Sequence, residues 1–421
     1  MIVYLVRISS TAARLTAILA LVALLTGCGS GLKGASASDA TAEANCPVTV
    51  LKTLGSVLQR IYREGINSER TLVAEHLIER SLPLRRAIET SSSSAAKSAA
   101  SELLHTGHMT NLKVIAGGRT LIDVGGAALT PLHGTIKDGS GRAIATYQTS
   151  VWADHGFASE AAGVTEGVIS VRSGSHTLGG TLSLPAGPLP DEGTITRHGV
   201  SYQYTSFAAK AYPSGDARIY LLRPSASISP LCGSSNEDTV VNTVSHIAHA
   251  IYAGEVGPRT KVQIRRIQSD TGLLEAVARR DRVATRVAVE RLLHHHVVRL
   301  RVFAAGKLLV DDGGPYVLGP VGANLHFHGQ RVGSFVLSIQ DDEGYLRLTR
   351  RLVGLKVLMY MTPTPGHPKL VKNSLGPNPG TVPASGRYTY HGETFRVYTL
   401  NAAAFPSGPL TVRVLIPIPY S

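Results

Sequence analysis

One segment in the second half of the chain decides the fold: Val298-Arg-Leu-Arg-Val-Phe-Ala-Ala-Gly-Lys-Leu-Leu-Val-Asp-Asp-Gly-Gly314. Apolar residues at positions 298, 300 and 302 alternate with arginine, which is the period of a strand with one buried face. A turn at Ala305–Lys307 follows, and the second apolar run, which begins at Leu308, ends at two glycines. The segment therefore predicts a β-hairpin.

The same pattern occurs earlier in the chain, as Leu112-Lys-Val-Ile-Ala-Gly-Gly-Arg-Thr-Leu-Ile-Asp-Val-Gly-Gly126. Ile122–Gly126 corresponds to Val310–Gly314, 188 positions later. Apolar residues at helical spacing precede both copies: Leu51, Leu54, Leu58 and Ile61 in the first, and Val240, Val244, Ile247 and Ile251 in the second. The sequence therefore predicts an internal duplication, with repeat one over 46–232 and repeat two over 233–421.

Each repeat is predicted to begin with helices and to continue with β-structure. In repeat two, the alternation over Phe335–Ile339 predicts a strand, Asp341–Gly344 a turn, and Tyr345 the start of the return strand. Ala153–Phe157 is the corresponding turn in repeat one. Such runs add up to about five antiparallel strands in one sheet per repeat. The predicted fold class is α+β, and 43% apolar composition is enough for two cored domains.

Residues 1–27 have the composition of an export signal. Arg7 and Arg14 are their only charges, and the apolar run that follows is shorter than the roughly twenty residues a spanning helix needs. The run closes on Leu25-Thr-Gly-Cys28, which resembles the lipobox of bacterial lipoproteins. We therefore expect Cys28 to be lipidated, residues 28–45 to form a flexible tether, and the protein to sit on the outer face of the cytoplasmic membrane. A plain signal peptide and an N-terminal anchor helix are the alternatives.

The chain contains three cysteines, which leaves an odd count. If Cys28 carries lipid, Cys46 and Cys232 remain and can pair in an oxidising compartment. Cys46 is expected just before the first helix of repeat one, and Cys232 just after its last strand. A disulfide would then join the two ends of that repeat, whereas two unpaired buried thiols are the alternative.

The charge balance is basic, with 42 lysines and arginines against 29 acids and a formal net charge of +13. The basic residues are scattered along the chain, and aromatic residues do not alternate with them. A surface that binds nucleic acid gathers its positive charge on one face or stripe. Anionic lipid headgroups beside an anchored protein account for the excess instead, so no nucleic-acid partner is expected.

Nearly the whole chain after the signal segment resembles, once per repeat, the Cache family of PAS-like sensor domains. The resemblance rests on a helix ending in Leu292-Leu293, a strand reading Val302-Phe303, and Gly306–Asp311 followed by two glycines; it is clearest over Asp281–Tyr345. It implies two tandem extracytoplasmic units that bind a small-molecule ligand. Family members usually continue into a transmembrane helix and a signalling module. Because the chain ends at Ser421 without either, the resemblance implies action through a separate membrane signalling protein or envelope partner.

The resemblance also implies, by position only, a set of ligand contacts: Tyr147, Trp152 and Asp154 in repeat one, and Tyr316, Asp341, Tyr345 and Arg347 in repeat two. Aromatic walls with a few charged groups are typical of small-molecule pockets. Repeat one holds the only tryptophan and the expected disulfide, so we expect the ligand there, with Trp152 as a wall. The alternative function is a structural or assembly lipoprotein that uses its Cache-like units as protein-interaction surfaces.

Other candidate sites have simpler structural explanations. His294–His296 with His326 and His328 could bind zinc or copper, but consecutive residues at a helix end point in different directions, and cationic histidines suit that end. Asp311-Asp312 and Asp341-Asp342 lie beside glycine in expected turns, which does not favour a catalytic carboxylate pair. No nucleophile, zinc-protease or phosphate-loop signature occurs. The sequence predicts no enzyme, no metal site and no cofactor.

Overall fold

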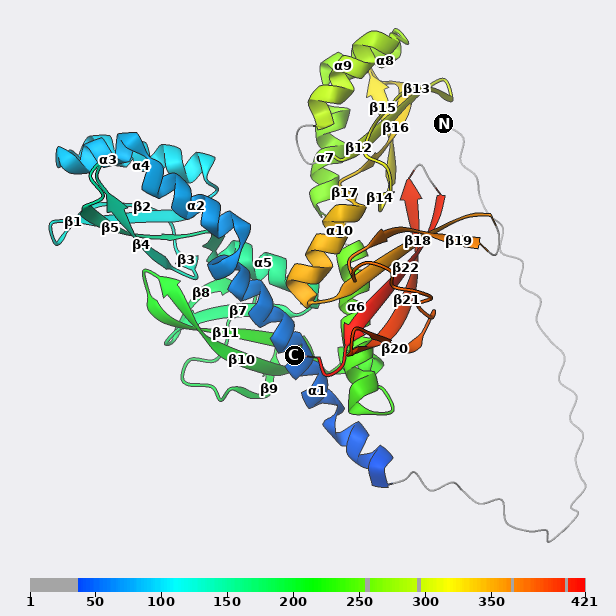
Figure 1. The fold of residues 1–421 in the computed structure, drawn as a ribbon, viewed down its shortest axis with the longest axis horizontal. Helices are drawn as coiled ribbons and strands as arrows, with labels where there is room; N and C mark the ends of the chain where they lie inside the picture. The colour runs from blue at the N-terminus through cyan, green and yellow to red at the C-terminus, as the bar shows by residue number, and fades with distance from the viewer. Residues whose placement is uncertain (1–36, 254–257, 294–296, 365–366, 406–407, 421) are drawn as a thin grey trace, which may run out of the picture.

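The computed structural model describes residues 37–253, 258–293, 297–364, 367–405 and 408–420 (Figure 1). The expected signal peptide with Cys28, and His294–His296, lie outside these ranges. No helix within them is both long enough and apolar enough to cross a membrane. Helices and antiparallel sheets make up the described chain, which confirms the α+β class.

Repeat one opens with helices and continues with two antiparallel sheets. The helices are α1 (Ala37–Asn67), α2 (Glu69–Arg80), α3 (Leu82–Glu89), α4 (Ser93–Thr106) and, between the sheets, α5 (Asp154–Thr165). The first sheet has the order β2-β1-β5-β4, from β1 (Asn111–Ala116), β2 (Arg119–Gly125), β4 (Leu132–Lys137) and β5 (Ala143–Ser150). The second has the order β6-β3-β10-β11-β7-β8, with β9 beside β10: β3 (Ala128–Leu129), β6 (Trp152–Ala153), β7 (Val168–Ser173), β8 (His176–Gly180), β9 (Glu192–Arg197), β10 (Val200–Tyr212) and β11 (Gly215–Pro224).

Repeat two has the same plan. Its helices are α6 (Asn236–Ala253), α7 (Pro258–Gln268), α8 (Thr271–Ala278), α9 (Arg282–Leu293) and α10 (Asp342–Leu348), which continues into a π-helical turn, Thr349–Val353. The first sheet, β13-β12-β16-β15, contains β12 (Arg299–Ala304), β13 (Lys307–Gly313), β15 (Val321–Phe327) and β16 (Gln330–Ser338). The second, β17-β14-β21-β22-β18-β19 with β20 beside β21, contains β14 (Val317–Leu318), β17 (Gln340–Asp341), β18 (Lys356–Thr364), β19 (His367–Asn373), β20 (Gly386–Tyr390), β21 (Glu393–Phe405) and β22 (Gly408–Pro417).

The predicted hairpin forms in both repeats. Val114 pairs with Ile122 across β1 and β2, and Val302 pairs with Val310 across β12 and β13. The register shifts directly after Val114 and directly after Val302, so the two hairpins share the same irregularity. This agreement of register is the structural counterpart of the repeated sequence.

The structure corrects two details of the β-region. Each repeat carries a four-stranded and a seven-stranded sheet rather than one sheet of about five strands, because the pairing of distant segments, which local periodicity does not show, decides how strands divide between sheets. The expected turns at Ala153–Phe157 and Asp341–Gly344 begin helices α5 and α10, so Tyr345 is helical and starts no return strand. The carboxylate of Asp341 caps α10 by accepting a hydrogen bond from the Gly344 amide at 2.6 Å, so the Asp that suggested a turn serves as an N-cap.

The disulfide between Cys46 and Cys232 is confirmed, with 5.6 Å between their Cα atoms. The first helix, however, starts earlier than expected. Helix α1 begins at Ala37, so residues 37–45 are helical rather than part of a flexible tether, and Cys46 lies inside the helix. The disulfide therefore ties the first third of a long helix to the segment that follows β11.

The two repeats share one hydrophobic core. Apolar side chains of α1, including Leu54 and Ile61, lie in the same buried cluster as Val244 and Ile251 of α6 and the inner residues of both seven-stranded sheets. Each four-stranded sheet has a separate core with its own short helices. In Figure 1 the two smaller units lie apart from each other, at the upper left and the upper right, and the shared core lies below them.

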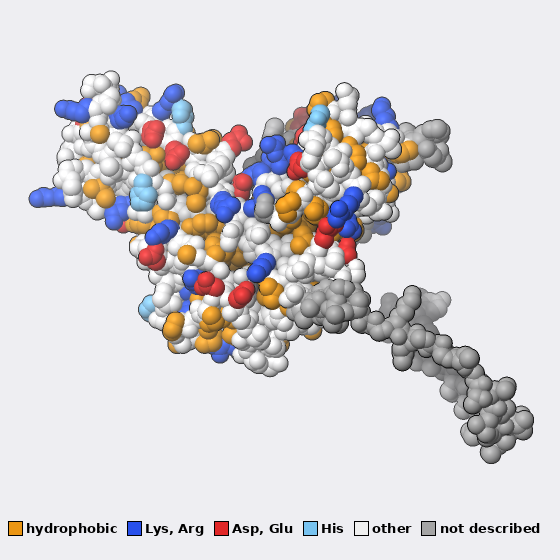
Figure 2. All heavy atoms as spheres, turned by 60° about the horizontal axis from the view of Figure 1, so that its bottom comes forward, with side chains coloured by type: hydrophobic (Ala, Val, Ile, Leu, Met, Phe, Trp, Pro, Cys, Tyr) orange, Lys and Arg blue, Asp and Glu red, His pale blue; other side chains and the backbone are white. Residues whose placement is uncertain are grey.

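Charged side chains also join the repeats. Arg351 donates to Glu64 of α1 at 2.7 Å, His246 lies 2.6 Å from Glu166 at the end of α5, and Arg259 of α7 donates to Glu160 of α5 at 2.6 Å. On the face in Figure 2, lysines and arginines are scattered among acidic and apolar side chains rather than gathered in a stripe.

Candidate functional site

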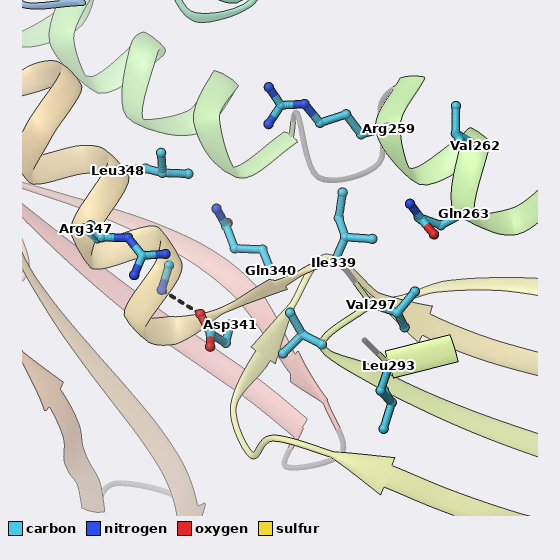
Figure 3. A pocket seen from close by; sticks show the side chains of 12 residues that line it. Arg259, Val262, Gln263, Leu293, Val297, Ile339, Gln340, Asp341, Arg347 and Leu348 are labelled. Atoms are coloured by element: carbon cyan, nitrogen blue, oxygen red, sulfur yellow. Dashed lines mark hydrogen bonds between the residues drawn. The ribbon is translucent and has the colours of Figure 1, made fainter. Parts of the chain in front are cut away.

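The largest pocket that we describe lies in repeat two, between α7, α10 and the short segment that links β16 to α10 (Figure 3). Its volume is about 770 Å³. The lining combines apolar and polar side chains: Arg259, Val262, Gln263, Leu293, Val297, Val298, Ile339, Gln340, Asp341, Gly344, Arg347 and Leu348. Small-molecule sites commonly have this size and this mixture.

The start of α10 positions one wall of the pocket. Because Asp341 caps the helix, its carboxylate is engaged with the Gly344 amide. Gly344 is needed at this point, since a Cβ there would lie 2.8 Å from Oδ1 of Asp341. The helix then places Arg347 beside the pocket. Among the described residues, no acidic side chain forms an ion pair with Arg347.

Two further polar groups line the pocket from other directions. Gln340 is only 4% exposed, and its carboxamide oxygen has no hydrogen-bond partner within the described chain. In Figure 3 its amide points into the space bounded by Arg347 and Arg259. Arg259 is largely exposed and is already paired with Glu160 of repeat one.

A second, smaller pocket of about 260 Å³ adjoins the first, because the two share Arg259, Ile339 and Leu348. It lies between the repeats, with α5 on one side and α6 and the end of α10 on the other. Its remaining lining is mostly apolar: Ser159, Glu160, Gly163, Val164, Ala250, Ile251 and Leu352.

Repeat one has a tryptophan where repeat two has Gln340. Trp152 of β6 pairs with Leu129 of β3, just as Gln340 of β17 pairs with Leu318 of β14. The indole packs edge-on against Phe157, with 6.0 Å between the ring centroids, and lies directly against Gly65 of α1. Trp152 thus packs on the shared core, and it lines neither of the two adjoining pockets.

Of the four ligand residues predicted for repeat two, two line the large pocket and two do not. Asp341 and Arg347 line the large pocket. Tyr345 does not, because it is fully buried and its hydroxyl donates to the Ala248 carbonyl at 2.9 Å; burial raises the pKa of this phenol. Tyr316 has a positive φ of 49° and packs half-buried against the shared core.

The residues predicted for repeat one do not gather around one cavity. Tyr147 is 2% exposed, and its hydroxyl donates to Glu79 at 3.1 Å; burial and that carboxylate raise the pKa of the phenol. Asp154, the first residue of α5, accepts a hydrogen bond from the His155 amide at 2.6 Å. Tyr147 belongs to the core of the four-stranded sheet, whereas Trp152 belongs to the shared core.

The carboxylates Asp311 and Asp342 form ion pairs with basic side chains. Asp311 pairs with Arg299 at 2.8 Å and Arg301 at 3.0 Å. Asp342 is buried 3.3 Å from the Lys372 ammonium, and desolvation raises the pKa of its carboxyl. Within the described ranges, no three histidine, cysteine or acidic side chains are grouped to hold a metal.

Sequence reasoning missed Arg259, Gln263 and Gln340. None of them belongs to a motif, and each is an ordinary surface or strand residue in its own segment. Only the approach of α7 to α10 brings them together.

Comparison with known proteins finds no matching family model and no matching curated protein. Among solved structures, two of the periplasmic domain of Vibrio cholerae LuxQ match at 8% identity, with TM-scores of 0.29 and 0.27. The matches cover 42% and 44% of this chain and 99% of those chains. An extracellular ligand binding receptor from Desulfohalobium retbaense DSM5692 matches at 12% identity, with a TM-score of 0.23, over 45% of this chain and 40% of that one.

Proposed function

We propose that the protein is an extracytoplasmic binding protein that holds a small molecule in the repeat-two pocket and acts by binding rather than by catalysis. The observation that carries this proposal is the 770 Å³ pocket, with an unpaired arginine, a buried unpartnered amide and apolar walls. Buried polar groups normally have hydrogen-bond partners, so a ligand's polar group beside Gln340 would supply a missing one. The site differs from the one expected from sequence, which lay in repeat one at Trp152.

A thermal-shift screen of the full, processed chain against a chemically varied library tests this proposal. A ligand that binds only the folded state stabilises it by about 2.7 kcal/mol at a hundred times its dissociation constant. The variant Arg347→Gln should lose most of the shift, because a charge-assisted hydrogen bond contributes about 1.5–3 kcal/mol. Arg350→Gln is the matched control, since Arg350 lies in the following turn outside the pocket lining. A hit that shifts the native chain and Arg347→Gln equally would contradict the assignment.

Lipid anchoring at Cys28 is part of the same proposal, and it rests on Leu25-Thr-Gly-Cys28. One acyl chain anchors only marginally, whereas the two chains of a diacylglyceryl group hold a protein at the membrane. The variant Cys28→Ala should move the protein from the membrane fraction to the soluble fraction. Retention of that variant through an uncleaved N-terminal segment would show that the anchor is a helix instead.

An anchored binding protein on the outer face needs a second protein to carry its signal inward. We therefore include a separate membrane signalling partner, recognised in the ligand-bound state, in the proposed function. Cross-linking in the native membrane with and without the screened ligand tests this point. Equal capture in the two states would mean that the partner does not respond to the ligand.

A further inference from the structure

The two adjoining pockets differ in chemistry. The larger one gathers the polar groups Gln340, Asp341 and Arg347. Past Ile339 and Leu348, the smaller one is lined mainly by apolar residues, Val164, Ala250, Ile251 and Leu352, with Ser159, Glu160 and Gly163 of α5 at its side. A molecule that filled both would need a polar end and an apolar end.

The charges at the polar end favour a single negative charge. Arg259 already has a partner in Glu160, and Asp341 is engaged as the cap of α10. Arg347 is the one guanidinium lining the pocket that lacks an acidic partner among the described residues. A planar carboxylate matches the fork of donors that arginine presents.

The apolar end favours an unbranched chain. The smaller pocket, at about 260 Å³, is roughly a third of the size of the larger one and lies between packed helices. Gly163 of α5 lines it, and a Cβ added there would meet nothing within 4 Å. Because Gly163 is exposed, the open space beside it is the rim of the smaller pocket.

We propose that the ligand is a free single-chain carboxylic acid, bound with its carboxylate at Arg347 and its hydrocarbon chain in the smaller pocket between the repeats. This inference rests on the proposed function of the repeat-two pocket. The chain then contacts α5 of repeat one as well as α6 and α10 of repeat two, so the ligand binds both repeats at once.

The first test is calorimetric titration of the full, processed chain with butanoate, hexanoate and octanoate, each below its aggregation concentration. Burial of each added methylene should tighten binding about fourfold. Octylamine has the same chain and the opposite charge, so it should bind at least tenfold more weakly than octanoate. Equal affinity for octylamine and octanoate would overturn the assignment of the carboxylate to Arg347.

The second test fills the smaller pocket. In Gly163→Leu the added side chain enters the space that we assign to the hydrocarbon chain, so octanoate should bind at least tenfold more weakly while butanoate binds within about twofold of native. Gly163→Ala is the matched control, because it makes the same change of helix propensity with little added volume. Its affinity for octanoate should stay within about threefold of native.

If Gly163→Leu binds octanoate as tightly as the native protein does, the placement of the hydrocarbon chain in the smaller pocket is wrong. If none of the carboxylates binds the native chain while the broader library yields a ligand that depends on Arg347, the ligand class is wrong and the proposed function stands. If the library also yields no ligand, both fail.

Discussion

Repeat one and repeat two share a topology but differ at one position that faces the middle of the molecule. Trp152 occupies that position in repeat one and packs against Phe157 and Gly65. In repeat two Gln340 occupies it and borders a pocket of about 770 Å³. The difference teaches that a duplicated backbone can fill this position with a packed side chain in one copy and border a pocket with it in the other.

The repeats differ in covalent support as well. Only repeat one is closed by a disulfide within the described chain, between α1 and the segment after β11. Repeat two, which holds the pocket, depends on its core and on contacts with repeat one. Four predictions test this division between a supporting repeat and a binding repeat, from the largest effect to the smallest.

Removal of the disulfide should have the largest effect. The double variant Cys46→Ala, Cys232→Ala frees a loop with a sequence separation of 186 residues. On the chain-entropy model, such a loop contributes about 4–5 kcal/mol to the free energy of unfolding. Chemical denaturation of the full chain measures the loss. A change below about 1 kcal/mol would mean that repeat one gains little from its cross-link.

An exchange of Trp152 and Gln340 between the repeats should separate an effect on the stability of the fold from an effect on ligand binding. Trp152→Gln removes a half-buried indole from the shared core and should cost about 3 kcal/mol. Gln340→Trp should cost less, because the indole can enter the pocket, but it should abolish ligand binding. Unfolding and titration of both variants measure the two effects. If Trp152→Gln abolishes binding and Gln340→Trp does not, repeat one is the binding repeat.

The pH dependence of stability should differ between two carboxyls, one in each repeat. Burial raises the pKa of Asp342, so the folded state holds this proton more tightly than the unfolded state. Its contribution to stability is therefore lost as the pH rises from the ordinary value of 3.8 through the raised one. The variant Asp342→Asn should remove this decline from a series of unfolding curves recorded between pH 3 and 7.

Asp138 in repeat one should show the opposite dependence of stability on pH. Hydrogen bonds, first from Ser140, lower the pKa of its carboxyl to about 2. The contribution of the Asp138 carboxylate to stability is present above pH 3.8 and is lost as the pH falls toward 2. Asp138→Asn should therefore lower stability at every pH above 3.8 and leave it nearly unchanged toward pH 2. If both variants changed the slope of stability against pH in the same pH range, the burial of Asp342 would not be the cause of its behaviour.

Loss of the contact between Glu160 and Arg259 should have the smallest effect on stability. Arg259 is mostly exposed, and exposed ion pairs contribute about 0–1 kcal/mol. The variant Glu160→Gln should leave the midpoint of unfolding almost unchanged. It also frees a second guanidinium beside the pocket, so an anionic ligand should bind about twofold to fivefold tighter. Weaker binding would show that Glu160 helps to hold the ligand.

Local patterns were predictable from the sequence where few residues decide the outcome. The hairpin at Val298–Gly314 follows from alternation and a glycine turn, and the pairing of Cys46 with Cys232 follows from an odd cysteine count. The start of α10 was not predictable in the same way. Asp341-Asp-Glu-Gly is compatible with a turn and with a capped helix, and the burial of Tyr345 with its hydrogen bond to the Ala248 carbonyl favours the helix.

The sequence by itself determined that the chain is a duplicated α+β unit with a disulfide across its first copy, because periodicity and repetition are properties of neighbouring residues. Only the tertiary structure decided that two sheets form in each copy, that α1 and α6 share a core, and that the 770 Å³ pocket lies in repeat two. Arg259, Gln340 and Arg347 come from separate elements and have no common pattern. Their meeting depends on how α7 packs toward α10, which no local stretch of sequence encodes.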